Sequence, residues 1–228
     1  MQAWFMIAAA ATLAVVASAQ ASHRDLPRSV LPVPGVPLSV DTIEEYVTKN
    51  PDGTSATEFN KTKYYRDAAG RMRSEMEMHD SAAGTLVWVV LDDSIDGFVA
   101  ILETEAKIAH RAKFSKPSSP GDWGIGLGTY GLAGVSGKTT RKTADLGKQS
   151  IGGVECAGAR TTTTSDERPS LIAVDELWIS KELELIGLQK HSGPDSEMTV
   201  RIQNVDRTVP DPALFVIPDD YRIREMTP

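Results

Sequence analysis

Alternation of apolar and charged residues constrains the fold of this chain more than any other feature. Across residues 71–79, the side chains of Met72, Ser74, Met76 and Met78 alternate with those of Arg71, Arg73, Glu75, Glu77 and His79. Successive side chains of a strand point to opposite faces of a sheet, so this spacing predicts a strand with one buried and one solvated face. Such strands are typical of antiparallel sheets.

Further strand-like segments follow along the chain, separated by turn residues. We expect strands at 40–49, 57–67, 71–79, 86–91, 146–151, 154–164, 171–180, 183–190 and 198–205. Residues 103–113 fit either a helix or a turn and a strand, and residues 210–215 fit a single helical turn. The sequence therefore predicts a mainly β fold, a curved antiparallel sheet or open half-barrel with few short helices.

The N-terminal residues carry an export pattern. Residues 5–16 form an unbroken apolar run, and Ala17-Ser18-Ala19 follows it as an A-x-A cleavage site. The run is shorter than the roughly 20 residues that cross a bilayer. We therefore predict a signal peptide at 1–19, with a periplasmic or secreted mature protein and no transmembrane segment. The prolines of 22–38 predict an extended leader over 20–38, and 39–228 is expected to form a single β-rich domain.

Charge and cysteine content narrow the function further. The net charge is −7, which argues against electrostatic binding to nucleic acid or anionic lipid. Cys156 is the only cysteine, so the chain has no internal disulfide and its fold must rest on its own core. We interpret Cys156 as a small buried thiol.

Several segments together resemble a known family. They are the strand and turn Glu176-Leu177-Trp178-Ile179-Ser180-Lys181-Glu182-Leu183, the returning strand at 201–205, the terminal Phe215-Val216-Ile217-Pro218, and an early hairpin of Tyr64-Tyr65-Arg66-Asp67 with residues 70–75. This pattern resembles the bacterial outer-membrane lipoprotein carrier superfamily and a group of uncharacterised exported bacterial proteins. The resemblance implies a curved half-barrel whose concave side holds acyl chains or another apolar ligand. The carriers begin with an amphipathic helix where this chain has prolines, so no functional residue is carried over.

The alternating segments also predict which side chains face the interior. We expect an apolar interior formed by Met72, Met76, Met78, Trp88, Trp178, Val200 and Ile202, and these are the candidate ligand-binding residues. The favoured function is a non-enzymatic exported module that binds a lipid or other apolar small molecule. The alternative is a structural or interaction protein of the cell envelope with a filled core and an envelope protein as its partner.

A glycine-rich loop at about 115–141 separates the two groups of strands. Aromatic and aliphatic residues interleave with its glycines, so the loop is either a flexible connector or a mobile lid, with Trp123 and Tyr130 as the candidate lid residues. Its Gly126-x-Gly128-x-x-Gly131 pattern matches a dinucleotide fingerprint. No strand precedes the pattern and no βαβ unit follows it, which excludes that interpretation.

One segment fits the spacing of a calcium loop. Asp92, Ser94, Asp96 and Glu103 supply side-chain oxygens at the required positions, and Phe98 would supply a carbonyl oxygen. The preceding residues form a strand rather than a helix, and a strand over 98–102 would carry Glu103 away from Asp92 at about 3.3 Å per residue. We expect the strand, so calcium is not predicted as a cofactor.

No other motif predicts a metal site or a catalytic site. The four histidines lack paired metal-ligand spacing, and Ser192 beside His191 lacks the G-x-S-x-G elbow of a hydrolase. A hydrolase assembled from distant residues is a third reading without a supporting motif. The sequence predicts no catalytic residue and no cofactor.

Overall fold

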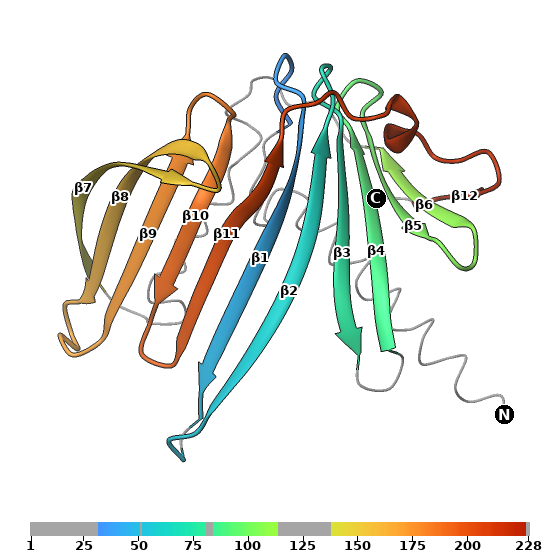
Figure 1. Ribbon diagram of the computed structural model, residues 1–228. Coiled ribbons are helices and arrows are strands. Elements are labelled where there is room, and N and C mark those ends of the chain that lie inside the picture. The colour runs from blue at the N-terminus through green and yellow to red at the C-terminus, as the bar shows by residue number, and fades with distance from the viewer. Residues whose placement is uncertain (1–31, 51, 81–83, 114–137, 227–228) are drawn as a thin grey trace, which may run out of the picture.

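The fold is a single open sheet of 12 strands, curved along its length (Figure 1). The structure is a computed structural model that describes residues 32–50, 52–80, 84–113 and 138–226. The predicted class, a mainly β protein with a curved antiparallel sheet, is confirmed. In the described residues, no helix has the length and apolar character needed to cross a membrane.

The strands follow the chain as a series of hairpins. They are β1 (Leu38–Lys49), β2 (Ser55–Arg66), β3 (Met72–Asp80), β4 (Gly84–Asp93), β5 (Phe98–Glu103), β6 (Ile108–Lys113), β7 (Thr139–Ile151), β8 (Val154–Ser165), β9 (Ile172–Ser180), β10 (Leu185–Ser192), β11 (Ser196–Asp206) and β12 (Arg222–Glu225). A short 3-10 helix, η2 (Pro212–Phe215), precedes β12. The order across the sheet is β12-β6-β5-β4-β3-β2-β1-β11-β10-β9-β8-β7. The β12–β6 pair is parallel, and every other pair is antiparallel.

Strand register sorts the side chains onto two faces, because directly opposed residues share a face and successive residues alternate. One row, from β11 to β4, contains Ile202, Thr42, Thr62, Met76 and Trp88. Met72 stands on the same side, and we call this side the Met72 face. The adjacent row contains Gln203, Asp41, Lys63, Glu75 and Val89, and it belongs to the opposite side, the Val89 face.

The C-terminal segment covers one end of the Val89 face. An apolar cluster of Val89, Leu91, Ala100, Leu102 and Ala109 lies there, with Ile217 and Tyr221 packed against it. The Asp211 carboxylate accepts a hydrogen bond from the Ala213 amide at 2.9 Å and so caps η2. Arg73 of β3 donates to the Leu214 carbonyl at 3.2 Å, which fixes η2 over the sheet.

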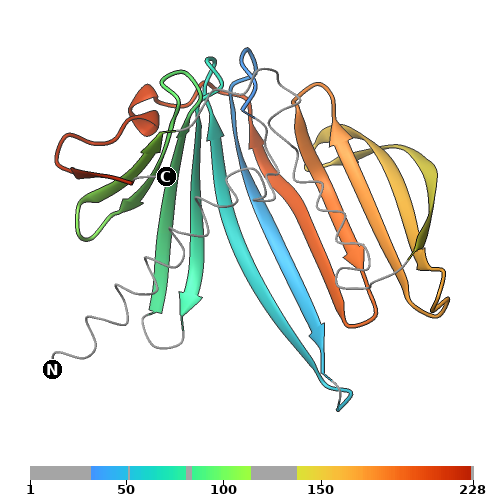
Figure 2. The ribbon, with the colours of Figure 1, turned by 180° about the vertical axis from the view of Figure 1, so that it is seen from behind.

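The long β7–β8 hairpin covers the other end of the same face. Its tip passes in front of the sheet in Figure 1 and behind it in Figure 2. Gly152 at the tip approaches Ile202 so closely that an added Cβ would lie 3.1 Å from the Ile202 side chain and carbonyl oxygen. Gly152 also has φ of +57°, which favours glycine in this tight turn. Behind the tip, Cys156 is fully buried, as predicted for a structural thiol.

A larger apolar cluster forms where β10 separates from β11, because their pairing ends at Leu188 and Arg201. Its buried members are Leu38, Val40, Tyr64, Met72, Val154, Cys156, Trp178, Leu183, Leu185 and Ile202. We call this set the large cluster. It joins the start of β1 to the β8–β10 end of the sheet, so it ties the first and last thirds of the chain together.

Most of the predicted strands are present, and their ends differ by a few residues. Residues 103–113 form a turn followed by β6 rather than a helix. The predicted helical turn at 210–215 appears as η2. β1 begins at Leu38, inside the predicted leader, and the predicted signal peptide lies outside the described residues. The single domain at 39–228 stays a prediction.

Candidate functional site

The Met72 face carries a broad apolar band. Its central row places Ile202, Met76 and Trp88 in register across five strands. Val90 and Ile101 continue the next row across β4 and β5. Ile202 and Ile101 are buried, whereas Met76, Trp88 and Val90 are partly exposed. The band therefore offers flexible and aromatic side chains that are not all enclosed by the described protein.

The predicted interior residues fall mainly on this face. Register places Met72, Met76, Trp88, Val200 and Ile202 together on the Met72 face, whereas the side chain of Met78 lies outside the part of the chain that the structure describes. Trp178 pairs with Leu188 and stands in the row of Arg201, on the Val89 face, but it shares the buried large cluster with Met72 and Ile202. Its indole ring lies over Gly158. The assignment of these residues to ligand binding remains a prediction, and the candidate lid residues Trp123 and Tyr130 lie outside the described residues.

Two polar groups border the apolar band on β1. Glu44 stands next to Val200 in the register, and the Tyr46 hydroxyl donates to a Glu44 carboxylate oxygen at 3.3 Å. Burial raises the pKa of the Glu44 carboxyl above its usual value of 4.5, and the hydrogen bond from Tyr46 opposes this effect. Glu44 therefore takes up a proton more readily than an exposed glutamate.

A histidine–aspartate pair stands two strands away on the same face. His191 of β10 opposes Asp175 of β9, and His191 Nδ1 lies 2.7 Å from Asp175 Oδ1. The His191 side chain is almost fully buried. A carboxylate in this position fixes the orientation of the imidazole ring. The sequence does not predict this pair, because the pair forms across strands and leaves no local spacing signal.

Two buried oxygen atoms on the Met72 face lack a hydrogen-bond partner within the described part of the chain. They are Thr62 Oγ1 and Asp175 Oδ2. A buried acceptor without a partner carries a desolvation cost of about 1–3 kcal/mol. A donor group on a bound molecule would remove that cost.

The calcium loop does not form. β5 runs from Phe98 to Glu103, and Asp92 opposes Val99 at the start of that strand. Glu103 lies four residues farther along, at about 3.3 Å per residue, and its carboxylate instead contacts His110 Nε2 at 2.6 Å. The turn between the strands is closed by Asp93, whose carboxylate accepts from the amides of Ile95 and Asp96 at 2.8 and 2.9 Å. The strand predicted over 98–102 is confirmed.

Searches with the sequence find no matching family model and no matching curated protein. Solved structures with a similar fold do exist. One is lipoprotein LppX from Mycobacterium tuberculosis, at 12% identity and a TM-score of 0.35, over 75% of this chain and 88% of that chain. Another is a LolA superfamily protein from Nitrosomonas europaea, at 8% identity and a TM-score of 0.36, over 85% of this chain and 94% of that chain.

A third similar structure is a complex of MucB with MucA from Pseudomonas aeruginosa, at 10% identity and a TM-score of 0.40. The match covers 82% of this chain and 58% of that chain. The expected resemblance to the lipoprotein carrier superfamily is thus found among solved structures. At these TM-scores the likeness concerns the curved sheet alone, so function must be derived from the chain's own residues.

Proposed function

We propose that this protein is an exported, non-enzymatic module that binds a lipid or other apolar ligand on its Met72 face. The observation that supports this most directly is the apolar band. It places Ile202, Met76 and Trp88 in one row, interrupted by Thr42 and Thr62, and Val90 and Ile101 in the next row. The Met and Trp side chains of the band are partly exposed. Each CH₂ group of a ligand that leaves water for such a surface contributes about 0.8 kcal/mol.

The composition of the band suits an irregular ligand. Met76 has an unbranched, polarisable side chain that adapts to different shapes, and Trp88 stands directly opposite it on β4. Binding pockets for small molecules are mainly apolar and contain a few placed polar groups. Glu44 on β1 and the His191–Asp175 pair on β10 and β9 supply such polar groups on the Met72 face.

This arrangement favours an amphiphile over a plain hydrocarbon. An acyl chain would lie along the band, and a polar head group would donate hydrogen bonds to Asp175 Oδ2 or Glu44. The partner class is therefore a lipid with a head group that carries hydrogen-bond donors.

Native mass spectrometry of the protein purified from its own host tests the proposal. We expect a co-purified ligand in the mass range of a lipid, and uptake of a fluorescent fatty acid by the delipidated protein. Met76→Gln should weaken the uptake, because it places an amide in the apolar band. Glu77→Gln is the matched control, because Glu77 is the next residue on β3 and lies exposed on the other face.

A clean mass without ligand, together with no fatty-acid uptake, would remove the binding function. The remaining interpretation would be a structural or interaction protein of the cell envelope. Equal effects of the two substitutions would show that fatty acid binds elsewhere on the protein.

A further inference from the structure

A cavity lies beside the tip of the β7–β8 hairpin, on the Val89 side of the sheet. The tip of the β7–β8 hairpin and the facing residues of β10 and β11 border a partly open space of about 660 Å³. The hairpin supplies one wall, and the two strands supply the floor and the other wall. The lining includes Ser150, Gly152, Lys190, Thr199, Arg201 and Gln203.

The lining is positively charged in a chain of net charge −7. It contains Lys190 and Arg201 and no acidic residue. Lys190 and Arg201 make no ion pair or side-chain hydrogen bond within the described residues. Other basic side chains of the β7–β8 hairpin form ion pairs. Lys148 pairs with Glu155 at 2.8 Å, and Arg160 pairs with Glu176 at 2.6 Å.

The neighbouring carboxylates leave this charge uncompensated. Glu176 opposes Lys190 in the register, but its Oε1 atom accepts two hydrogen bonds from Arg160, at 2.8 and 2.6 Å. Glu45 opposes Thr199 on the other side of the cavity and makes no ion pair with either cation. Two cations thus face one space whose remaining polar lining consists of hydroxyl and amide groups.

We propose that this cavity binds a small polar molecule that carries a phosphate group. Arginine offers a planar fork of donors that matches phosphate oxygens, and lysine adds a point charge beside it. Ser150, Thr199 and Gln203 are placed to bind hydroxyl groups of the same molecule, and the volume lies within the usual range of about 300–1,000 Å³ for ligand sites. Ile202, which the register assigns to the Met72 face, also lines this space, whereas Leu188, Lys190, Thr199, Arg201 and Gln203 belong to the Val89 face. The proposal does not depend on the function proposed for the Met72 face.

The packing of the hairpin tip against β11 sets the shape of the cavity. A Cβ at Gly152 would crowd Ile202 at 3.1 Å, and the φ of +57° strains any larger residue at this position, so glycine favours the close approach of the tip to the sheet. A larger residue there would lift the wall away from Arg201 while leaving both cations in place.

Isothermal titration calorimetry at low ionic strength tests the site with two probes. Glycerol 3-phosphate represents a free phosphate ester, and short-chain phosphatidic acid represents the same group on a lipid. We expect heat of binding with at least one probe. Arg201→Ala should weaken binding by about 10- to 100-fold, since charge-assisted hydrogen bonds to phosphate are lost. Gly152→Val should also weaken it, although it changes no charge.

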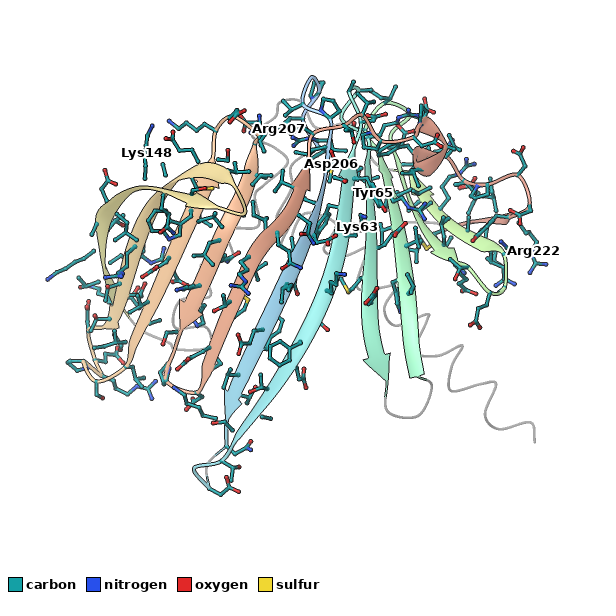
Figure 3. All side chains as sticks on the ribbon, viewed as in Figure 1. Lys63, Tyr65, Lys148, Asp206, Arg207 and Arg222 are labelled. Carbon is teal, nitrogen blue, oxygen red and sulfur yellow. The ribbon has the colours of Figure 1, made fainter. Side chains whose placement is uncertain are left out.

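Lys148→Ala is the matched control. Lys148 projects from the same hairpin away from the sheet (Figure 3) and also removes one positive charge when replaced. It should leave the affinity within about twofold, because Lys148 does not line the cavity and its charge is already paired with Glu155. Binding of glycerol 3-phosphate would identify a free ester as the ligand class, and binding of phosphatidic acid alone would identify a lipid head group. No heat with either probe, or equal losses in Arg201→Ala and Lys148→Ala, would overturn the proposal.

Discussion

At the scale of single residues, Arg66 connects segments that are distant in the sequence. Its side chain is fully buried, and its guanidinium donates to the carbonyls of Val36 at 2.7 Å, Leu183 at 2.6 Å and Glu184 at 3.3 Å. Burial lowers the pKa of Arg66 to about 10, partly offset by the charge of Glu184, so the group stays charged at neutral pH. One side chain thus joins the segment before β1 to the β9–β10 turn.

Replacing Arg66 should therefore be strongly destabilising. Arg66→Met leaves three carbonyl groups without their donor, and each buried unsatisfied group costs about 1–3 kcal/mol. We expect the free energy of unfolding in urea to fall by at least about 3 kcal/mol. Lys63→Met, on an exposed position of the same strand, should change it by no more than about 0.5 kcal/mol. Similar losses in the two variants would contradict the role assigned to Arg66.

Glu44 predicts a pH dependence of stability. Because the folded chain holds the Glu44 proton more tightly than the unfolded chain, folding takes up a proton between pH 4.5 and the raised folded pKa. Stability therefore falls as the pH rises through that interval. Glu44→Gln should raise the Tm at pH 7, and the gain should shrink toward zero below pH 4.5. The control Glu45→Gln removes the same charge from the other face. A gain independent of pH, or equal in both variants, would refute this account.

The two residues differ in how far the sequence predicts them. Glu44 follows Val40 and Thr42 at a spacing of two, so alternation alone places it on the buried face. Arg66 gives no such signal, because its partners are backbone carbonyls from distant segments. The His191–Asp175 pair is hidden for a similar reason, since it depends on the register between two strands.

At the scale of elements, the contact between β8 and β9 rests on one glycine. Gly158 opposes Trp178, and a Cβ at this position would overlap the indole ring. Gly158→Ala should lower the free energy of unfolding by about 1–3 kcal/mol, as is typical of overpacking. The loss should be smaller in a Trp178→Phe background, because the smaller ring leaves room for the methyl group. Additive losses in the urea melts would show that the two residues do not interact in this way.

Strand prediction was least accurate for β7 and β12. The expected strand at 146–151 is the end of β7, which begins at Thr139 and is exposed along most of its length. With no buried face, these residues show no period-two pattern. β12 is short, charged and exposed, and it pairs with β6 through a parallel contact from a remote part of the chain. Neither feature is visible in local sequence.

At the scale of the whole molecule, the sheet has two faces with different coverings. On the Val89 face, η2 with the C-terminal segment covers one end and the β7–β8 hairpin covers the other, with a polar stretch between them that includes Lys63 and Tyr65 (Figure 3). The Met72 face instead carries the apolar band, which Thr42 and Thr62 interrupt on β1 and β2. Sequence alternation predicted this division for most strands, but not for Trp178, because the register shift between Ile186 and Leu188 depends on strand pairing.

The central claim, that an apolar ligand binds the Met72 face, is tested most directly by fluorescence quenching with a brominated fatty acid. Two chains are compared, one with Trp88 as its only tryptophan and one with Trp178, the others being replaced by Phe. Bromine quenches over short distances, so a ligand on the Met72 face should quench Trp88 and leave Trp178, which stands in the register of the other face, nearly unchanged. Equal quenching of both residues, or none of Trp88, would contradict the account.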